Sequence, residues 1–332
     1  QEDIDGRVVI GPLNSFYCRA GSGAPIASIP DFLQGSHVTL FGPPDDAKLS
    51  INAMNAFHRT LPGEPAIVAE LLKDFSGSAK WGADDEDSKT PLRSDLVLAG
   101  ENLTGCLQGT ISYDDPRSGK EYRLAGSQRS VPIKRFPGLA LPCPFLFLHG
   151  NPLPLHLYDF ALHLFANWNN PQALAFYVPK LETEEEAAYI RVMLERAEQL
   201  IAAQHPQYRI GTIRLLVVLE NPRAMFRVNE IMDALHPYFA GASLGWHDFL
   251  ASTARLMKND GNYRIPVKAD PGIVINYIKA SHDLLAEVVG SRGGIKVGGM
   301  YGVLPADGDI RGASFQVAIK GFIKDVITQM KR

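Results

Sequence analysis

The sequence lacks any apolar run long enough to span a lipid bilayer. A transmembrane helix needs about 20 consecutive apolar residues, and polar residues interrupt every apolar stretch of this 332-residue chain before that length. The first residues, QEDIDGRVVIG, are acidic and lack the apolar core of a secretory signal. The C-terminal Met-Lys-Arg is not the peroxisomal Ser-Lys-Leu signal. We therefore expect a cytoplasmic protein without a membrane partner.

Cysteines are few, and neither sign of charge dominates. Cys18, Cys106 and Cys143 lie far apart, and an odd number of cysteines cannot complete a disulfide framework, which indicates a reducing compartment. A net charge of −3 argues against a nucleic-acid partner, because such proteins need a basic surface. The nine histidines show no zinc-binding spacing. His156 and His163, seven residues apart on one amphipathic stretch, are expected to be structural.

The sequence does contain a regular alternation of short β-branched runs and longer amphipathic stretches. This pattern predicts an α/β fold, a (β/α)8 TIM barrel over residues 31–332, with residues 1–30 as a short N-terminal extension and a β-hairpin insertion within 101–130. A doubly wound open sheet is the competing fold. Strands are expected at 38–42, 79–83, 131–135, 174–178, 213–219, 239–244, 263–267 and 295–300. Helices are expected at 46–57, 156–168, 183–204, 222–236, 247–258, 271–290 and 312–330, with a loop and short helix at 59–78.

Acidic residues recur directly after the predicted strands. Glu220 comes directly after the run IRLLVVL, Asp248 lies shortly after FAGASLG, and the acidic segment 84–87 comes directly after AKWGA. The C-terminal ends of barrel strands meet at one face, where a hard cation such as Mg²⁺ relieves the repulsion between carboxylates. A single carboxylate after a strand is more often a helix cap or a surface charge. The convergence of several favours a metal site.

One cationic side chain is expected beside these acids. Arg135 ends the run VPIKR, and its planar guanidinium suits the carbonyl or carboxylate oxygens of a 2-oxo acid. The alternative is a structural ion pair between Arg135 and one of the acids.

Several stretches of the chain resemble the malate synthase family. The segments IPDFLQGSHVTLFGPPDDAKLSINAMNA, GADDEDSKTPL, GTISYDDPRSGKEYRL, VPKLETEEEA, VVLENPRAMFRVNEIMDAL, GASLGWHDFLAS and VGGMYGVLP follow in the family's order. They cover about residues 30 to 310, and several ordered motifs are more specific than any single one. The resemblance implies an Mg²⁺-dependent enzyme that joins, or cleaves, a carbon–carbon bond between an acyl-CoA enolate and a 2-oxo acid such as glyoxylate.

The resemblance also implies roles for single residues. Glu220 in VLEN and Asp248 in GWHDF match the family's metal-binding acids. Arg135 in RFPGL falls at the catalytic arginine, which would stabilise the enolate and the growing alkoxide. Asp84 and Glu86 match acids that hold metal-bound water and orient the arginine.

Further positions match the family's substrate contacts. Four consecutive residues correspond to its substrate-binding turn: Gly245, Trp246, His247 and Asp248. The backbone N–H groups of His247 and Asp248 match those that bind the glyoxylate carboxylate. Lys180 and Pro266 lie in motifs near the family's coenzyme A path.

The sequence departs from the family pattern in three places. GWHDF replaces the family's Arg-Trp-Asp-Tyr, and residues 59–78 are an insertion beside the acidic loop. The family's general base is an aspartate in a C-terminal helical domain, and no residue here matches it. The base could come from an acid of the 84–87 loop or from another copy in a homo-oligomer, as in related short barrels that cleave malyl- and citramalyl-CoA. Lyase-type or specialised enolate chemistry, and a non-catalytic binding module, are therefore the alternatives.

Overall fold

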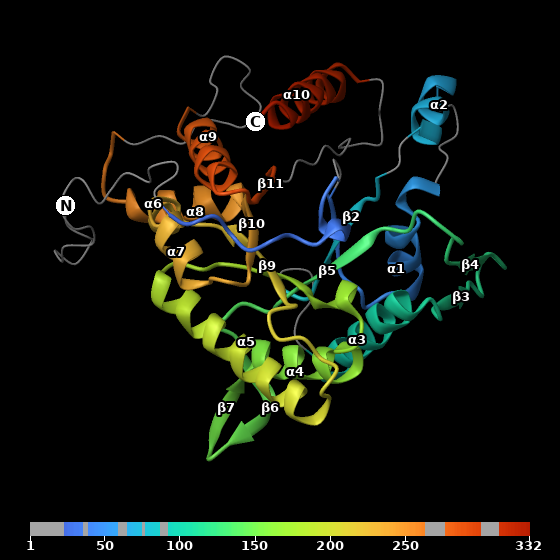
Figure 1. Cartoon of the computed structure of the whole chain (residues 1–332). Helices are drawn as coiled ribbons and strands as arrows, with labels where there is room; N and C mark the ends of the chain where they lie inside the picture. Colours follow the sequence, from blue (N-terminus) through green and yellow to red (C-terminus); the bar gives the residue numbers. More distant parts are fainter. Residues whose placement is uncertain are drawn as a thin grey trace. The chain divides into compact units, whose positions relative to one another are not determined.

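The computed structural model describes most of the chain (Figure 1). The described segments are residues 23–35, 39–58, 65–74, 77–86, 92–262, 276–299 and 312–332. The strand predicted at 263–267, and with it Pro266, lies outside the described residues. Within these segments, no helix is both long and apolar enough to cross a membrane.

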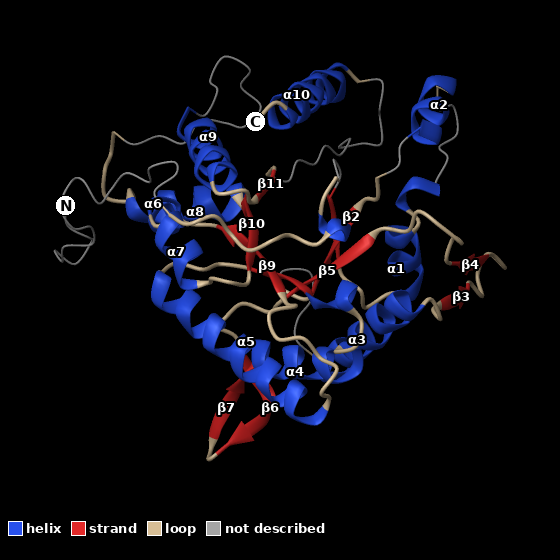
Figure 2. Ribbon diagram, in the orientation of Figure 1, coloured by secondary structure: helices blue, strands red, loops and turns tan. Residues whose placement is uncertain are grey.

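Strands and helices alternate along the chain, as the sequence predicts (Figure 2). The main sheet contains β1 (Thr39–Gly42), β2 (Lys80–Asp84), β5 (Val131–Arg135), β8 (Ala175–Val178), β9 (Arg214–Leu219), β10 (Phe239–Leu244) and β11 (Ile295–Val297). The α-helices are α1 (Ala47–Met54), α2 (Ala66–Asp74), α3 (Arg93–Gln108), α4 (Leu155–Asn167), α5 (Glu184–Gln204), α6 (Pro222–Phe226), α7 (Val228–Ala234), α8 (Trp246–Leu256), α9 (Asn276–Ser291) and α10 (Ala313–Met330). Short 3-10 helices span Asp31–Leu33, Ala56–His58 and Pro171–Leu174.

The seven strands of the main sheet follow one another in the order β1-β2-β5-β8-β9-β10-β11. β1, β2, β5 and β8 pair in parallel, as do β10 and β11. Parallel neighbours need crossover connections, which helices usually supply. A doubly wound sheet reverses its strand order at a switch point, whereas this order follows the chain throughout. The topology therefore favours the barrel over the open sheet.

Contacts within the chain define two compact units. The described residues of the first unit are 23–27, 180–192, 217–262, 276–299 and 312–332. The second unit contains the described residues within 28–179 and 193–216.

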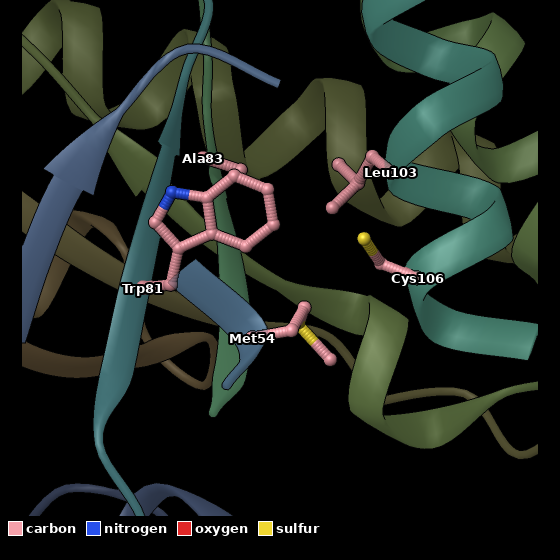
Figure 3. Close-up of a cluster of buried hydrophobic side chains, with 5 residues drawn as sticks. All are labelled: Met54, Trp81, Ala83, Leu103 and Cys106. Atoms are coloured by element: carbon pink, nitrogen blue, oxygen red, sulfur yellow. The ribbon is translucent and has the colours of Figure 1, made fainter. Parts of the chain in front are cut away.

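In the second unit, an apolar cluster joins β2 to helices α1 and α3 (Figure 3). Trp81 and Ala83, two residues apart on β2, share one face of the strand. Met54 of α1 and Leu103 and Cys106 of α3 meet them there, and all five side chains are buried. The indole N–H donates to the carbonyl at the end of β1, at 3.1 Å. The ring can therefore be buried without an unsatisfied polar atom.

The strands of the second unit form a curved sheet. The rings of Phe41 on β1 and Tyr177 on β8 lie 5.5 Å apart between centroids, although β2 and β5 separate these strands. Three strand spacings in a flat sheet would cover about 14 Å. Gly82 on β2 makes room for the contact, because a Cβ there would lie 2.5 Å from the Phe41 ring. The sheet therefore curves toward the face that carries these residues, as barrel strands do.

Residues 101–130, within which the hairpin insertion was predicted, begin with the last turns of a helix. Helix α3 covers residues 101–108, since its apolar residues recur at helical spacing, with Leu96, Ala99, Leu103 and Cys106 buried. The hairpin follows it: β3 (Ser112–Asp114) pairs antiparallel with β4 (Glu121–Arg123). Gly119 in the turn has a φ of +67°, a conformation that glycine adopts readily.

A second hairpin, β6 (Pro142–Leu148) with β7 (Asn151–Pro154), is not among the elements that the sequence predicts. Its prolines argue against strands, since proline cannot donate to a ladder. The turn residues His149 and Gly150 both have positive φ values, 50° and 79°. A two-residue type I′ turn requires this backbone conformation.

In the first unit, Arg292 anchors the described N-terminal residues. Its Nε donates to the Ala24 carbonyl at 2.8 Å, and its own carbonyl accepts from the Ile26 N–H at 3.1 Å. The guanidinium also pairs with Asp233 at 2.5 Å. Residues 23–27 of the predicted extension therefore pack on the first unit.

Candidate active site

Glu220 directly follows β9, and its side chain is buried in the first unit. Behind it, the Asn221 side chain accepts a hydrogen bond from the Ala224 N–H at 2.8 Å, and Pro222 opens helix α6. The N-cap and the proline at the first helical position turn the chain sharply after the strand. In front, the Lys180 N–H donates to Glu220 Oε2 at 2.9 Å. The turn therefore places Glu220 at the end of β9, and the Lys180 N–H holds its carboxylate.

Gly245 leaves the space that the Glu220 carboxylate occupies. A Cβ at this position would lie 2.5 Å from Glu220 Oε1 and 2.8 Å from its Cδ, far inside van der Waals contact. The Gly245 N–H donates to the Leu219 carbonyl at 2.9 Å, which joins the ends of β9 and β10. The absence of a side chain at residue 245 thus forms a cradle for the acid.

Asp248 lies in the first turn of α8, where the helix dipole favours a negative charge. Its Oδ2 is 3.2 Å from Lys180 Nζ, and the two side chains are 44% and 39% exposed. Lys180 was expected near the coenzyme A path. In addition, it contacts both acids of the predicted metal site, Glu220 through its backbone and Asp248 through its ammonium group.

The residues present fit a hard divalent cation. Mg²⁺ uses one or two carboxylates and keeps water or substrate on its remaining positions, and Glu220 and Asp248 supply two carboxylates. Gly245 leaves space for the first carboxylate, and the second is paired with the Lys180 ammonium, which a bound cation would have to displace or lie beside. Among the residues that the structure describes, there is no group of three or more His, Cys, Asp or Glu side chains placed to bind a metal. Glu220 and Asp248 are the two carboxylates of the predicted magnesium site, and their joint binding of a cation stays a prediction.

Arg135 lies in the second unit, where it contacts both acids that the sequence assigned to it. Its guanidinium is 3.3 Å from Asp84 Oδ2 and 3.0 Å from Glu86 Oε2. The parallel register places Asp84 directly beside Arg135, and the Glu86 N–H donates to Asp84 Oδ1 at 3.0 Å. All three side chains are less than a tenth exposed. Buried, charge-assisted pairs of this kind fix the plane of the guanidinium.

A second ionic cluster lies next to this one, and the sequence analysis missed it. Lys134 pairs with Asp85 and, at 2.9 Å, with Asp159 of α4, and all three side chains are nearly fully buried. Burial raises the pKa of Asp85 to about 7, although Lys134 opposes the shift. Adjacent strand residues point to opposite faces, so Lys134 and Arg135 face opposite sides of β5. The adjacent charges Asp84-Asp85 and Lys134-Arg135 were the signal that could have revealed two clusters.

Tyr177 adds a buried hydroxyl beside Arg135. Burial raises its pKa, and the nearby Arg135 guanidinium lowers it. Within the described residues, this hydroxyl has no hydrogen-bond partner. The concave face of the second unit therefore presents an unsatisfied hydroxyl next to the guanidinium.

Trp246 and His247, two of the predicted substrate-binding residues, contact each other at the start of α8. Trp246 is buried, and its ring lies 3.6 Å from that of His247 between centroids. A Cβ on Gly299 would lie 3.1 Å from Trp246 Cδ1, so the chain passes close to the indole.

The predicted site residues thus form two groups. The first unit brings together Lys180, Glu220 and residues 245–248, and the second unit brings together Arg135, Asp84 and Glu86. The meeting of the two groups at one site stays a prediction.

Comparisons with known proteins point to one family. The family model described as "Malate synthase, TIM barrel domain" matches residues 133–332, more than half of the chain. Malate synthase of Oryza sativa subsp. japonica is 28% identical over 320 residues, which cover 94% of this chain and 52% of that protein. Malate synthase A of Escherichia coli (strain K12) is 29% identical over 314 residues, 92% of this chain and 53% of that protein. The chain therefore spans about half the length of the curated relatives that it matches.

A solved structure shares the fold. A structure of Haloferax volcanii malate synthase, native at 3 mM glyoxylate, superposes with a TM-score of 0.50 at 13% identity. The match covers 88% of this chain and 68% of that one. The structural match and the family model agree on a TIM-barrel domain, which confirms the predicted fold class. Closure by an eighth strand stays a prediction.

Proposed function

Because the chain belongs to the malate synthase TIM-barrel family, we propose that it is an Mg²⁺-dependent enzyme acting on an acyl-CoA and a 2-oxo acid such as glyoxylate. A base, either an acid of the 84–87 loop or a group from another copy of the chain, would accept the α-proton of the acyl-CoA. The resulting enolate would form a carbon–carbon bond with the 2-oxo carbonyl carbon, and hydrolysis of the thioester by water would then release CoA and the hydroxy acid. One observation carries the proposal: Lys180 contacts Glu220 through its backbone N–H and Asp248 through its ammonium, so two oxygen-donor side chains contact the same residue. Relatives named malate synthase support the choice of substrates.

In this proposal the first unit binds the 2-oxo acid. Glu220 and Asp248 would hold Mg²⁺, which supplies Lewis-acid polarisation of a carbonyl when it is bound. The N–H groups of His247 and Asp248 belong to the first turn of α8, and a helix N-terminus favours anions. They would bind the substrate carboxylate.

The second unit would supply the positive charge that stabilises the enolate oxygen of the acyl-CoA. Arg135, oriented by Asp84 and Glu86, would donate hydrogen bonds to the enolate oxygen and then to the developing alkoxide. Such preorganised donors stabilise charge that appears only in the transition state. The two carboxylates contribute by keeping the guanidinium in one orientation.

The test is product identification with a matched pair of variants. The wild-type chain, given Mg²⁺, acetyl-CoA and glyoxylate, should form malate, detected by mass spectrometry. Asp248→Ala should lower the rate by at least about 100-fold, since loss of even an outer-shell partner of a metal site costs 10–100-fold. Asp260→Ala, at an exposed aspartate beyond the end of α8, is the control and should retain the wild-type rate.

Other outcomes separate the alternatives. Full activity in Asp248→Ala would show that the assigned centre is wrong. Release of glyoxylate and acetyl-CoA from malyl-CoA, without synthesis, would indicate a lyase. A chain that binds neither Mg²⁺ nor glyoxylate in calorimetry would be a non-catalytic module.

A further inference from the structure

Lys180 is held in an uncommon backbone conformation at the acidic cluster of the first unit. Its φ is +53°, a region that few non-glycine residues adopt. In this conformation its N–H donates to Glu220 at 2.9 Å while its ammonium lies 3.2 Å from Asp248. A backbone outlier that coincides with contacts to two proposed metal ligands suggests a function.

We propose that Lys180 is a positioning residue for the cation site: its backbone N–H fixes Glu220, and its ammonium holds Asp248 until a divalent cation replaces it. This inference rests on the proposed metal site. It adds that the Lys180 ammonium competes with the cation for Asp248. The backbone contact does not depend on the side chain, so it can persist after the ammonium leaves. Lysine suits this exchange, because its point charge sits on a flexible four-carbon stem.

Electrostatics gives the direction of the effect. The ammonium neutralises Asp248, so a cation that binds this carboxylate must displace the ammonium or bind beside it. Both routes weaken cation binding, because like charges repel or an existing ion pair is lost. Removing the charge at residue 180 should therefore tighten binding.

Exposure makes the exchange feasible. Lys180 and Asp248 are 39% and 44% exposed, so a displaced ammonium can remain hydrated. Lys134 provides the contrast within the same chain, since it is 1% exposed between Asp85 and Asp159. Displacing that buried ammonium would leave an unpaired charge in the interior, which is costly.

The test measures cation binding to the full chain without substrate. Calorimetry with Mg²⁺ and electron paramagnetic resonance with Mn²⁺ give dissociation constants that do not depend on turnover. Lys180→Gln should tighten binding by roughly three- to tenfold at low salt, the range expected for a half-exposed ion pair. The gain should shrink as ionic strength rises. Lys180→Arg keeps the charge and should stay within about twofold of wild type.

The control is a second exposed lysine–aspartate pair in the same unit. Lys279 lies 2.7 Å from Asp283, so Lys279→Gln removes a charge of the same kind from a pair that includes neither Glu220 nor Asp248, and it should leave cation binding unchanged. Equal or weaker binding in Lys180→Gln, with its fold intact by circular dichroism, overturns the proposal while the metal site stands. A wild-type chain that binds no divalent cation overturns the metal site itself, and the inference with it.

Discussion

At the scale of single residues, the orientation of Glu220 depends on the lack of a side chain at Gly245. The carboxylate lies where a Cβ on residue 245 would be, while the Lys180 N–H holds it from another direction. The two constraints act on different oxygens of one carboxylate, since Oε1 faces the glycine and Oε2 accepts the hydrogen bond. A small change at residue 245 should therefore reach the cation site directly.

Gly245→Ala tests this constraint. The new Cβ would displace the Glu220 carboxylate, a flexible group that can move without unfolding the chain. We expect Mg²⁺ affinity to fall by about 10–100-fold, the range seen when support for a metal ligand is lost, while the melting temperature changes little. Gly261→Ala, where a Cβ would meet nothing within 4 Å, is the control. Unchanged Mg²⁺ binding in Gly245→Ala would show that the space at residue 245 does not position Glu220 for the cation.

At the scale of secondary-structure elements, the Lys134 cluster ties β5 to the end of β2 and to helix α4. Lys134 contacts Asp85, which follows β2, and Asp159 of α4. On the opposite side of β5, Arg135 contacts Asp84, the last residue of β2. The two clusters therefore link the same pair of strand ends from opposite sides of β5.

Lys134→Met should destabilise the protein by about 3–5 kcal/mol, because it leaves Asp85 and Asp159 as buried acids without their cation. Urea unfolding measures the change in free energy. Combining it with Asp85→Asn and Asp159→Asn should restore part of the loss, since the buried charges are then gone. Lys73→Met, at an exposed position on α2, is the control. A loss below about 1 kcal/mol in Lys134→Met would show that the cluster contributes little.

At the scale of the whole molecule, buried histidines determine part of the response to acid. Burial lowers the pKa of His163 to about 3 and that of His156 to about 4. The Ala173 carbonyl can only accept, so His163 Nε2, 2.8 Å away, carries the proton. Its Nδ1 has no hydrogen-bond partner among the described residues, so this buried nitrogen cannot take a proton cheaply. Both histidines are thus neutral inside the fold, as their predicted structural role requires.

The contribution of these histidines to stability should therefore fall as the pH drops below about 6.5, because an unfolded histidine binds a proton there and the folded one does not. For His163 this loss amounts to roughly 1.4 kcal/mol per pH unit down to its folded pKa. Asp85 acts in the opposite direction, because its pKa is raised to about 7. The test is therefore a comparison of variants: His163→Gln should flatten the decrease in unfolding free energy between pH 6.5 and 4.5. The exposed His58→Gln should keep the wild-type slope, and equal slopes in all three proteins would contradict the prediction.

The sequence by itself determined the alternating elements and the acids at the strand ends. The seven strands of the main sheet coincide closely with predicted ones, because hydrophobic period and turn residues are local properties. The position of Glu220 before an Asn-Pro helix start, and of Asp84 and Arg135 at the ends of β2 and β5, also follow from local pattern. Helix α3 and the hairpin β6–β7 were missed: no element was predicted where α3 begins, and prolines obscured the hairpin.

Only the tertiary structure decided which charges meet. Lys180 and Glu220 are 40 residues apart, and Lys134 and Asp85 are 49 apart, so no local pattern links them. Pairing of this kind depends on strand register and on the curvature of the sheet. Those properties arise from packing between distant segments, whereas the hydrophobic period of a segment depends only on the residues of that segment.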